Sequence, residues 1–246
     1  MIKTIVCFAY VAAGMLLLTP FALIVVIFSL FGLRKIMLLM MYRIAQGWAR
    51  LLIKLTGCTI TVSGRENIPR SREGGICFVS NHSGFFDIVL LLAYAGRPIG
   101  FVAKKELLLV PFLNMWVSVL GGLFIDRKNI RKALRTINRG IARIKSGGGM
   151  IVFPEGHRAK GQGLLPFHPG SLKLATQAEA PIVPVAISGR YDLFEKRYRV
   201  DNSVPVTISF GKPIGTAELP IADRKQILSD NIYAVIKEML ERDAGP

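Results

Sequence analysis

The chain has 246 residues, of which 51% are hydrophobic, and its mean hydropathy is +0.43. It carries 32 Lys and Arg residues against 16 Asp and Glu residues, which gives a formal net charge of +16 at pH 7. Disordered chains combine high charge with low hydrophobicity, so this composition excludes intrinsic disorder and fits one large domain or two small ones.

The first feature along the chain is an uncharged apolar run over residues 4–33. As one helix it would be about 45 Å long, against about 30 Å for the hydrocarbon core of a bilayer. Pro20 divides the run into two shorter arms, so a re-entrant hairpin is an alternative to a single span. A cleaved signal is disfavoured, because the run is long and no small-residue cleavage site closes it. We therefore predict a hydrophobic membrane anchor over residues 1–35.

Basic residues follow this run, namely Arg34, Lys35 and Arg43. By the positive-inside rule they place the remainder of the protein on the cytoplasmic face of the membrane. The three cysteines have no paired spacing, so no disulfide framework is predicted, as is typical of a reducing compartment.

Residues 36–56 form the pattern of a basic amphipathic helix. Arg43, Gln46, Arg50 and Lys54 share one stripe, and apolar side chains occupy the rest of the surface. Such a helix suits the headgroup region of an anionic bilayer. A helix packed on the body of the protein would give the same pattern, so the two interpretations stay open.

From residue 57 onward short β-branched runs alternate with helical stretches. Strands are predicted at residues 59–63, 76–80, 99–103, 123–126, 150–153, 182–187 and 204–210. Helices are predicted at residues 87–94, 111–119, 129–146, 170–179 and 222–242. The alternation predicts an α/β fold in which a mostly parallel sheet is flanked by helices, as one domain over residues 57–246.

Chemically capable side chains follow four successive predicted strands. In chain order they are His82, Asp87, Lys104, Lys105, Arg127, Glu155, Gly156 and Arg158. Ligands of parallel sheets bind at the carboxyl ends of the strands, so we expect these residues to form one site.

His82 and Asp87 are the candidates for acid–base chemistry. On one continuous helix they would lie about 140° apart, so pairing requires His82 in a loop and Asp87 in the first turn of the next helix. A His held by a carboxylate can act as a general base, whereas an Asp in a first turn can also be a simple helix cap. There is no G-x-S-x-G motif, and Ser83 is poorly placed for activation, so the reacting hydroxyl is expected to belong to a substrate.

The cations indicate what that substrate carries. Lys104, Lys105, Arg127 and Arg158 would bind a phosphate, with Gly156 permitting close approach of the backbone. A separate stripe of arginines on the helix predicted at residues 129–146, which includes Arg143, is interpreted as a solvated or bilayer-facing surface.

Four segments in order resemble the motifs of the glycerolipid acyltransferases. They are Asn81-His82-x4-Asp87 and residues 122–127, 153–158 and 180–185. Together they are most similar to the 1-acyl-glycerol-3-phosphate acyltransferases, also called lysophosphatidic acid acyltransferases. The likeness runs from about residue 57 to residue 213, with one departure: His157 stands where the family usually has Thr.

The resemblance implies an O-acyltransferase of phospholipid synthesis. His82, oriented by Asp87, would deprotonate the sn-2 hydroxyl of lysophosphatidic acid as it attacks an acyl thioester of coenzyme A or of acyl carrier protein, giving phosphatidic acid. The residues implied at the glycerol phosphate are Arg127, Glu155, Gly156 and Arg158, and position adds Lys104 and Lys105. No cofactor and no metal is implied. Residues 107–120 would line a groove for the acyl chain, or else form an ordinary buried helix.

Other functions remain as alternatives. His157 favours an acyltransferase of the same fold with another lyso-lipid acceptor, such as a lyso-ornithine lipid or a lysophospholipid in remodelling. A zinc site formed by His82, His157 and His168 is disfavoured, because these residues lack the spacing of zinc ligands. A nucleic-acid-binding function would fit the pI near 10.2, but the sequence contains no nucleic-acid-binding motif. An inactive membrane scaffold would have no need of His82 and Asp87. We therefore expect lipid and bilayer partners and no nucleic acid.

Overall fold

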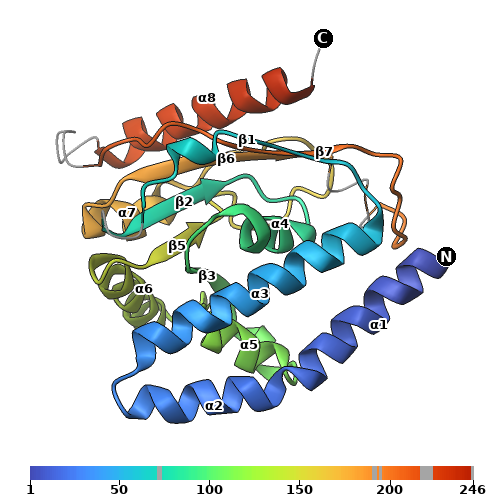
Figure 1. Ribbon diagram of the computed structural model, residues 1–246. Helices are drawn as coiled ribbons and strands as arrows, with labels where there is room; N and C mark the ends of the chain where they lie inside the picture. Colours follow the sequence, from blue (N-terminus) through green and yellow to red (C-terminus); the bar gives the residue numbers. More distant parts are fainter. Residues whose placement is uncertain (71–73, 190–192, 194–195, 217–223, 245–246) are drawn as a thin grey trace.

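A computed structural model describes residues 1–70, 74–189, 193, 196–216 and 224–244. Within them lies a seven-stranded sheet with helices on both faces (Figure 1). The strands are β1 (Ile60–Ser63), β2 (Ile76–Ser80), β3 (Ile99–Lys104), β4 (Leu123–Ile125), β5 (Gly149–Val152), β6 (Ile182–Ser188) and β7 (Val206–Phe210). The α-helices are α1 (Ile2–Leu17), α2 (Thr19–Leu30), α3 (Arg34–Thr56), α4 (Phe86–Tyr94), α5 (Leu113–Val119), α6 (Ile130–Lys145), α7 (Lys173–Ala178) and α8 (Arg224–Ala244). Short 3-10 helices are η1 (Arg65–Asn67), η3 (Lys105–Leu109) and η4 (Pro169–Leu172).

The sheet has the strand order β1-β7-β6-β2-β5-β3-β4. Strands β6, β2, β5, β3 and β4 run parallel, whereas β7 is antiparallel to β6 and parallel to β1. The mostly parallel sheet flanked by helices is thus confirmed, with strands close to the predicted ranges. The start of the helix predicted at residues 222–242 lies outside the described residues. The carboxyl ends of five neighbouring strands therefore meet at one edge of the sheet.

Two hydrophobic cores cover the two faces of the sheet. Helices α3 and α4 pack on one face around Phe78, Leu90 and Ile151. Helices α6, α7 and α8 cover the other face around Met150 and Ile182. Both faces of the central strands are dry, which explains why their sequences are continuously apolar rather than alternating.

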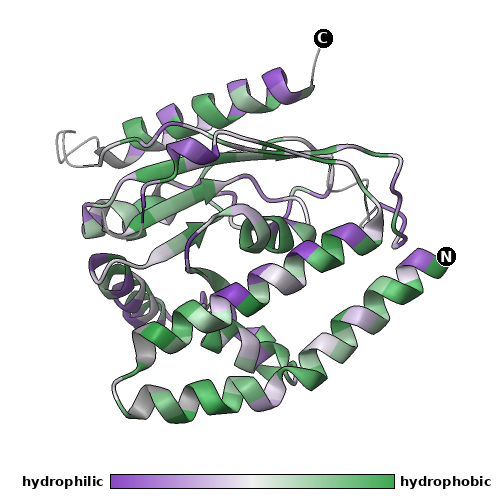
Figure 2. Cartoon of the chain, viewed as in Figure 1, coloured by the Kyte–Doolittle hydropathy of each residue, from purple (hydrophilic) through white to green (hydrophobic). Residues whose placement is uncertain are grey.

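The predicted anchor consists of two helices, α1 and α2, which meet at Leu18. Pro20 lies in the first turn of α2, where its missing N–H has no partner to lose. Both helices lie beside α3, and both are apolar along almost their whole length (Figure 2). The stretches Ile2–Val25 and Ile36–Thr56 are long and apolar enough to cross a membrane by length and composition.

Helix α3 packs on the body of the protein, mainly against α4. Its predicted polar stripe is wrong at Gln46, which is 6% exposed and faces the body. The Gln46 Nε2 donates to the hydroxyl of Tyr42 and to the carbonyl of Ala93, each at 3.3 Å. The Arg50 Nε donates to the same Ala93 carbonyl at 3.2 Å. That carbonyl lies near the end of α4, where helical carbonyls lack partners within the helix, so it recruits polar groups from α3.

Candidate active site

The loop after β2 is fixed in place by Asn81. This side chain is 5% exposed, and its amide makes two hydrogen bonds with the backbone of Ile187 in β6. Nδ2 donates to the Ile187 carbonyl and Oδ1 accepts from the Ile187 N–H, both at 3.0 Å. The side chain thereby extends the pairing of β2 and β6 by one residue and determines where the next residue, His82, leaves the sheet.

His82 and Asp87 lie in the arrangement that their spacing requires, with His82 in the loop and Asp87 in the first turn of α4. The His82 Nδ1 lies 2.7 Å from the Asp87 Oδ2. The same oxygen accepts backbone N–H groups from Ser83 at 2.9 Å and from Gly84 at 3.1 Å. The Asp87 side chain is completely buried. A buried carboxylate with these donors is held in one orientation and holds the imidazole in turn.

The ring of His82 is partly accessible to solvent. Its side chain is 19% exposed, and it stacks on Phe153 with ring centroids 4.1 Å apart. An ionised carboxylate only accepts hydrogen bonds, so we assign the proton to Nδ1, which leaves a lone pair on Nε2. Sequence reasoning did not single out Phe153, although it opens the Phe-Pro-Glu-Gly segment after β5.

Glu155 lies behind His82 and is 1% exposed. Its Oε1 accepts the backbone N–H of His82 at 2.6 Å, and its Oε2 accepts the N–H of Leu165 at 3.3 Å. The backbone N–H of Ala159 donates to the His82 carbonyl at 2.8 Å. The segment after β5 thus binds both backbone polar groups of His82, and Glu155 fixes the backbone from which the imidazole projects.

Arg127, Gly156 and Arg158 lie around the same loop. The Arg127 Nη1 donates to the Gly156 carbonyl at 2.6 Å. Gly156 has a φ of +72°, and a Cβ there would lie 3.1 Å from the ring of His168, so glycine suits the turn. The Arg158 guanidinium lies over the ring of Phe85, 4.2 Å from its centroid, as a cation–π contact. Two predicted cations therefore lie beside the His82 loop.

The two predicted lysines are less closely tied to this group. The Lys105 Nζ lies 2.9 Å from the Asp126 Oδ2, in an ion pair whose side chains are 39% and 14% exposed. The hydrogen bond from Lys105 lowers the pKa of Asp126, and in return it raises the pKa of Lys105. Lys104 is exposed at the end of β3 and shares only this edge of the sheet.

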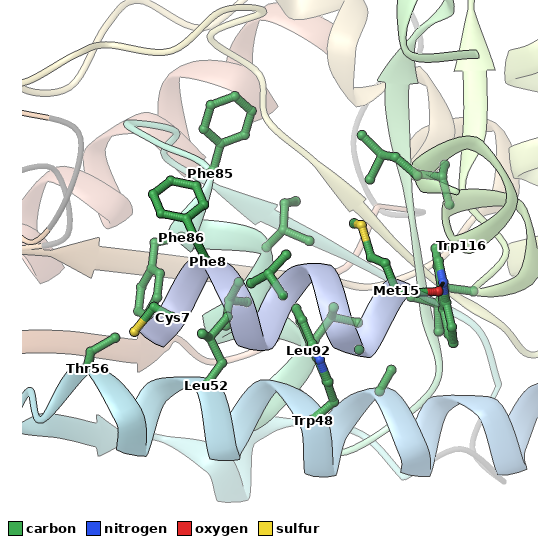
Figure 3. A pocket seen from close by; sticks show the side chains of 18 of the residues that line it. Cys7, Phe8, Met15, Trp48, Leu52, Thr56, Phe85, Phe86, Leu92 and Trp116 are labelled. Carbon is green, nitrogen blue, oxygen red and sulfur yellow. Dashed lines mark hydrogen bonds between the residues drawn. The ribbon is translucent and has the colours of Figure 1, made fainter. Parts of the chain in front are cut away.

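An apolar cavity of about 440 Å³ lies next to the His82 loop. Phe85 and Phe86, close after His82, line one end, and Met15 and Trp116 lie at the other (Figure 3). The α3 side chains that line it are Ala45, Trp48, Leu52 and Thr56. Eleven residue steps along a helix correspond to about 16 Å, so the cavity is elongated. Its other walls come mainly from α1, α4 and α5.

The segment predicted to line an acyl-chain groove, residues 107–120, borders this cavity. It contributes Leu107, Leu113, Trp116, Val117 and Leu120. The contribution of α1 was not predicted. Among the described residues, no three His, Cys, Asp or Glu side chains come together in a group that could hold a metal ion.

The chain is similar to known acyltransferases in sequence and in structure. A family model described as Acyltransferase matches residues 59–188. A 1-acyl-sn-glycerol-3-phosphate acyltransferase of Escherichia coli (strain K12) is 33% identical over 195 residues, which cover 76% of this chain and 78% of that protein. One of Saccharomyces cerevisiae is 31% identical over 191 residues, covering 75% of this chain and 62% of that protein.

A solved structure is similar over the whole chain. It is the crystal structure of the 1-acyl-sn-glycerophosphate (LPA) acyltransferase PlsC from Thermotoga maritima. The two structures align with a TM-score of 0.81 and 25% sequence identity, covering 100% of this chain and 96% of the other. The likeness includes α1 and α2, which lie outside the segment matched by the family model.

Proposed function

Because the chain belongs to the acyltransferase family, we propose that it moves an acyl chain from a thioester to the sn-2 hydroxyl of 1-acyl-glycerol-3-phosphate. The product is phosphatidic acid, an intermediate of phospholipid synthesis. The observation that carries the proposal is the His82–Asp87 pair, whose loop lies beside two arginines and an apolar cavity. The names of the relatives support the choice of acceptor.

In the proposed reaction the Nε2 of His82 takes the proton of the acceptor hydroxyl as its oxygen attacks the thioester carbonyl. Asp87 stabilises the imidazolium that forms. The tetrahedral adduct then expels the thiolate, which takes the proton back from His82. The C–O bond replaces the C–S bond, and His82 returns to its starting state. The protons balance within these groups, so the proposal invokes no cofactor and no metal.

The phosphate of the acceptor is assigned to Arg127 and Arg158. Arg127 uses one N–H on the Gly156 carbonyl and has four further donors, and Arg158 is held flat by Phe85. Lys104 and Lys105 add positive charge at the same edge. Glu155 is assigned to support His82 rather than to contact substrate, because it is buried and both its oxygens accept backbone N–H groups.

The apolar cavity is assigned to an acyl chain. Its volume lies within the range of small-molecule sites, and its lining is almost entirely hydrocarbon. The thioester carrier is coenzyme A or acyl carrier protein, both of which are anionic and suit the charge of +16. We further propose that α1 and α2 attach the protein to the cytoplasmic face of a membrane.

An acyl-transfer assay on the purified protein in detergent tests the proposal. Lysophosphatidic acid is compared with 1-acylglycerol and a lyso-ornithine lipid, using coenzyme A and carrier-protein thioesters. We expect Arg158→Ala to raise the KM for lysophosphatidic acid about tenfold or more, since a hydrogen bond to a charged group contributes about 1.5–3 kcal/mol. The KM for 1-acylglycerol should stay unchanged.

Arg139→Ala, an exposed change on α6, is the matched control and should leave both constants unchanged. Transfer only to acceptors without phosphate would contradict the phosphate assignment and favour the lyso-ornithine alternative. Absence of transfer to every lyso-lipid would contradict the proposed function itself.

A second variant tests the acyl-chain assignment. Ala45 is 5% exposed and lines the cavity at the end with Met15 and Trp116, away from His82. Ala45→Phe should fill that end and lower kcat/KM for long-chain donors about tenfold, since each excluded methylene forfeits about 0.8 kcal/mol. Short-chain donors should be used as before.

Ala12→Phe is the control, because Ala12 is exposed on α1 and does not line the cavity. Thermal melting shows whether Ala45→Phe overpacks the fold. An equal loss with long and short donors, in a variant that melts normally, would place the acyl chain elsewhere.

A further inference from the structure

A run of exposed apolar side chains lies between β3 and α5, in residues 107–112, which we name the apolar loop. Leu108 is 47% exposed, Leu109 86%, Val110 41% and Phe112 44%. Single exposed apolar residues are common, but a contiguous group on one protrusion is typical of a contact with a partner or a membrane. Of residues 107–112, Leu107 alone lines the apolar cavity, so the cavity does not explain the other apolar side chains.

The apolar loop is held in its exposed shape by hydrogen bonds. The Asn114 Nδ2 donates to the Leu108 carbonyl at 2.8 Å, and the Val110 N–H donates to the Leu107 carbonyl at 3.2 Å. Phe112 has a φ of +64°, which is uncommon for a residue with a side chain. The hydrogen bonds therefore fix the loop in a conformation that exposes its apolar side chains. The positive φ of Phe112 adds an energetic cost to this conformation.

The apolar loop is continuous with the apolar N-terminal helices through α5. Trp116 of α5 belongs to the same buried cluster as Ala22 and Val25 of α2. Its Nε1 donates to the Met15 carbonyl of α1 at 3.4 Å. The outward side chains of α2, such as Phe21 and Ile27, are 52% and 54% exposed. Apolar side chains are thus exposed on the apolar loop and on α2, and α5 connects these two segments through its buried contacts.

Basic residues adjoin the apolar loop on the site side. Lys104 directly precedes η3 and is exposed, and Arg127 and Lys128 follow the neighbouring strand β4. Cations beside exposed apolar side chains match a surface in which anionic headgroups overlie hydrocarbon. A protein partner would not require the continuity with α2.

We propose that the apolar loop inserts into the boundary between headgroups and acyl chains of a bilayer that contains anionic lipid. The loop is then a second attachment beside α1 and α2, and it holds the His82 edge of the sheet against the membrane. The proposed function enters only here: a lyso-lipid acceptor reaches His82 from this surface without leaving the bilayer.

Insertion is measured by depth-dependent quenching. Leu109→Cys, in a chain with Cys7, Cys58 and Cys77 replaced, is labelled with an environment-sensitive fluorophore and reconstituted into vesicles of phosphatidylcholine and phosphatidylglycerol. Spin-labelled lipids with the spin at shallow acyl positions should quench this label and shift its emission to the blue. The control is Glu241→Cys on α8, whose side chain is 68% exposed on the other side of the sheet. Equal, weak quenching of both labels would overturn the proposal.

A kinetic experiment tests whether insertion of the apolar loop is needed for transfer to an acceptor in the membrane. Leu109→Glu should lower transfer to lysophosphatidic acid in vesicles about tenfold, the size expected when one large apolar side chain no longer leaves water. Transfer to a short-chain, water-soluble acceptor should stay unchanged. Ile227→Glu on α8, 41% exposed in the parent, is the matched control.

Equal loss with both acceptors would overturn the assigned role of the loop. The quenching arm does not depend on catalysis. If the unaltered protein transferred no acyl chain, the proposed function would fail while the insertion proposal still received its test.

Discussion

His82→Ala is expected to lower kcat for acyl transfer by about 10² to 10⁴, the range typical of a positioned general base. The KM values should change little, because the imidazole acts on the proton of the hydroxyl and the cavity and arginines are left in place. The fold should persist, since the ring is partly exposed and stacks on Phe153 at the edge of the sheet. Steady-state kinetics in detergent, with circular dichroism and thermal melting, measure both quantities.

Two companion variants make the result specific. Asp87→Asn presents an amide N–H or a carbonyl to Nδ1 and cannot stabilise the imidazolium as a carboxylate does, so kcat should also fall. His157→Ala removes an exposed imidazole from the neighbouring segment and should keep kcat within a few-fold of the parent value. Full activity in His82→Ala would show that another group accepts the proton. Loss in His157→Ala of the same size would move the base to that residue.

Glu155→Gln is expected to lower kcat about 10²-fold, the cost of misplacing a reacting group by about 1 Å. The carboxylate accepts the N–H groups of His82 and Leu165, whereas an amide retains one oxygen and opposes an N–H with its own NH₂ group. The His82 backbone must then shift. The KM for the acceptor should change little, because Glu155 is buried away from the substrate side.

Glu155→Ala separates positioning from folding. It leaves two N–H groups without this acceptor, each costing about 1–3 kcal/mol if it stays dry, so the melting temperature should fall as well as kcat. Glu238→Gln, an exposed change on α8, is the control. If Glu155→Gln instead raised the acceptor KM at constant kcat, the carboxylate would contact the glycerol phosphate, as the family resemblance implies.

The location of the site was predictable because it depends on topology. Parallel strands place their carboxyl ends at one edge, so the side chains after β2, β4 and β5 had to meet once the alternation of strands and helices was recognised. The pairing of His82 with Asp87 was predictable for a local reason, since a loop followed by a helical first turn brings positions five apart together.

The direction of individual polar side chains was not predictable. Glu155 follows β5 as Arg158 does, yet one points inward to backbone N–H groups and the other outward over Phe85. Arg143 was interpreted as part of a solvated or bilayer-facing stripe, but its Nη2 donates to the Leu120 carbonyl at 3.3 Å, next to the turn at Gly121. The burial of such groups depends on carbonyls that distant segments bring near them. The periodicity of apolar residues along the sequence does not predict which carbonyls these are.

The contribution of α1 to the cavity was hidden for a related reason. A position that faces lipid and a position that faces an apolar cavity both favour apolar side chains, so the sequence does not distinguish the two. Gly14 is the exception, because a Cβ there would lie 2.2 Å from the Trp48 Nε1. Only glycine allows α1 to cross the indole so closely, and that contact becomes visible only when α3 lies beside α1.

Helix α1 is part of the predicted anchor and also lines the cavity, which has a practical consequence for shortened forms of the protein. A form that begins at α3 would retain His82, Asp87 and the strand edge but would lack one long wall of the cavity, including Val11 and Met15. Such a form would report on proton transfer and phosphate binding in isolation. Its preference among acyl chains would describe a more open groove than the cavity that α1 helps to line.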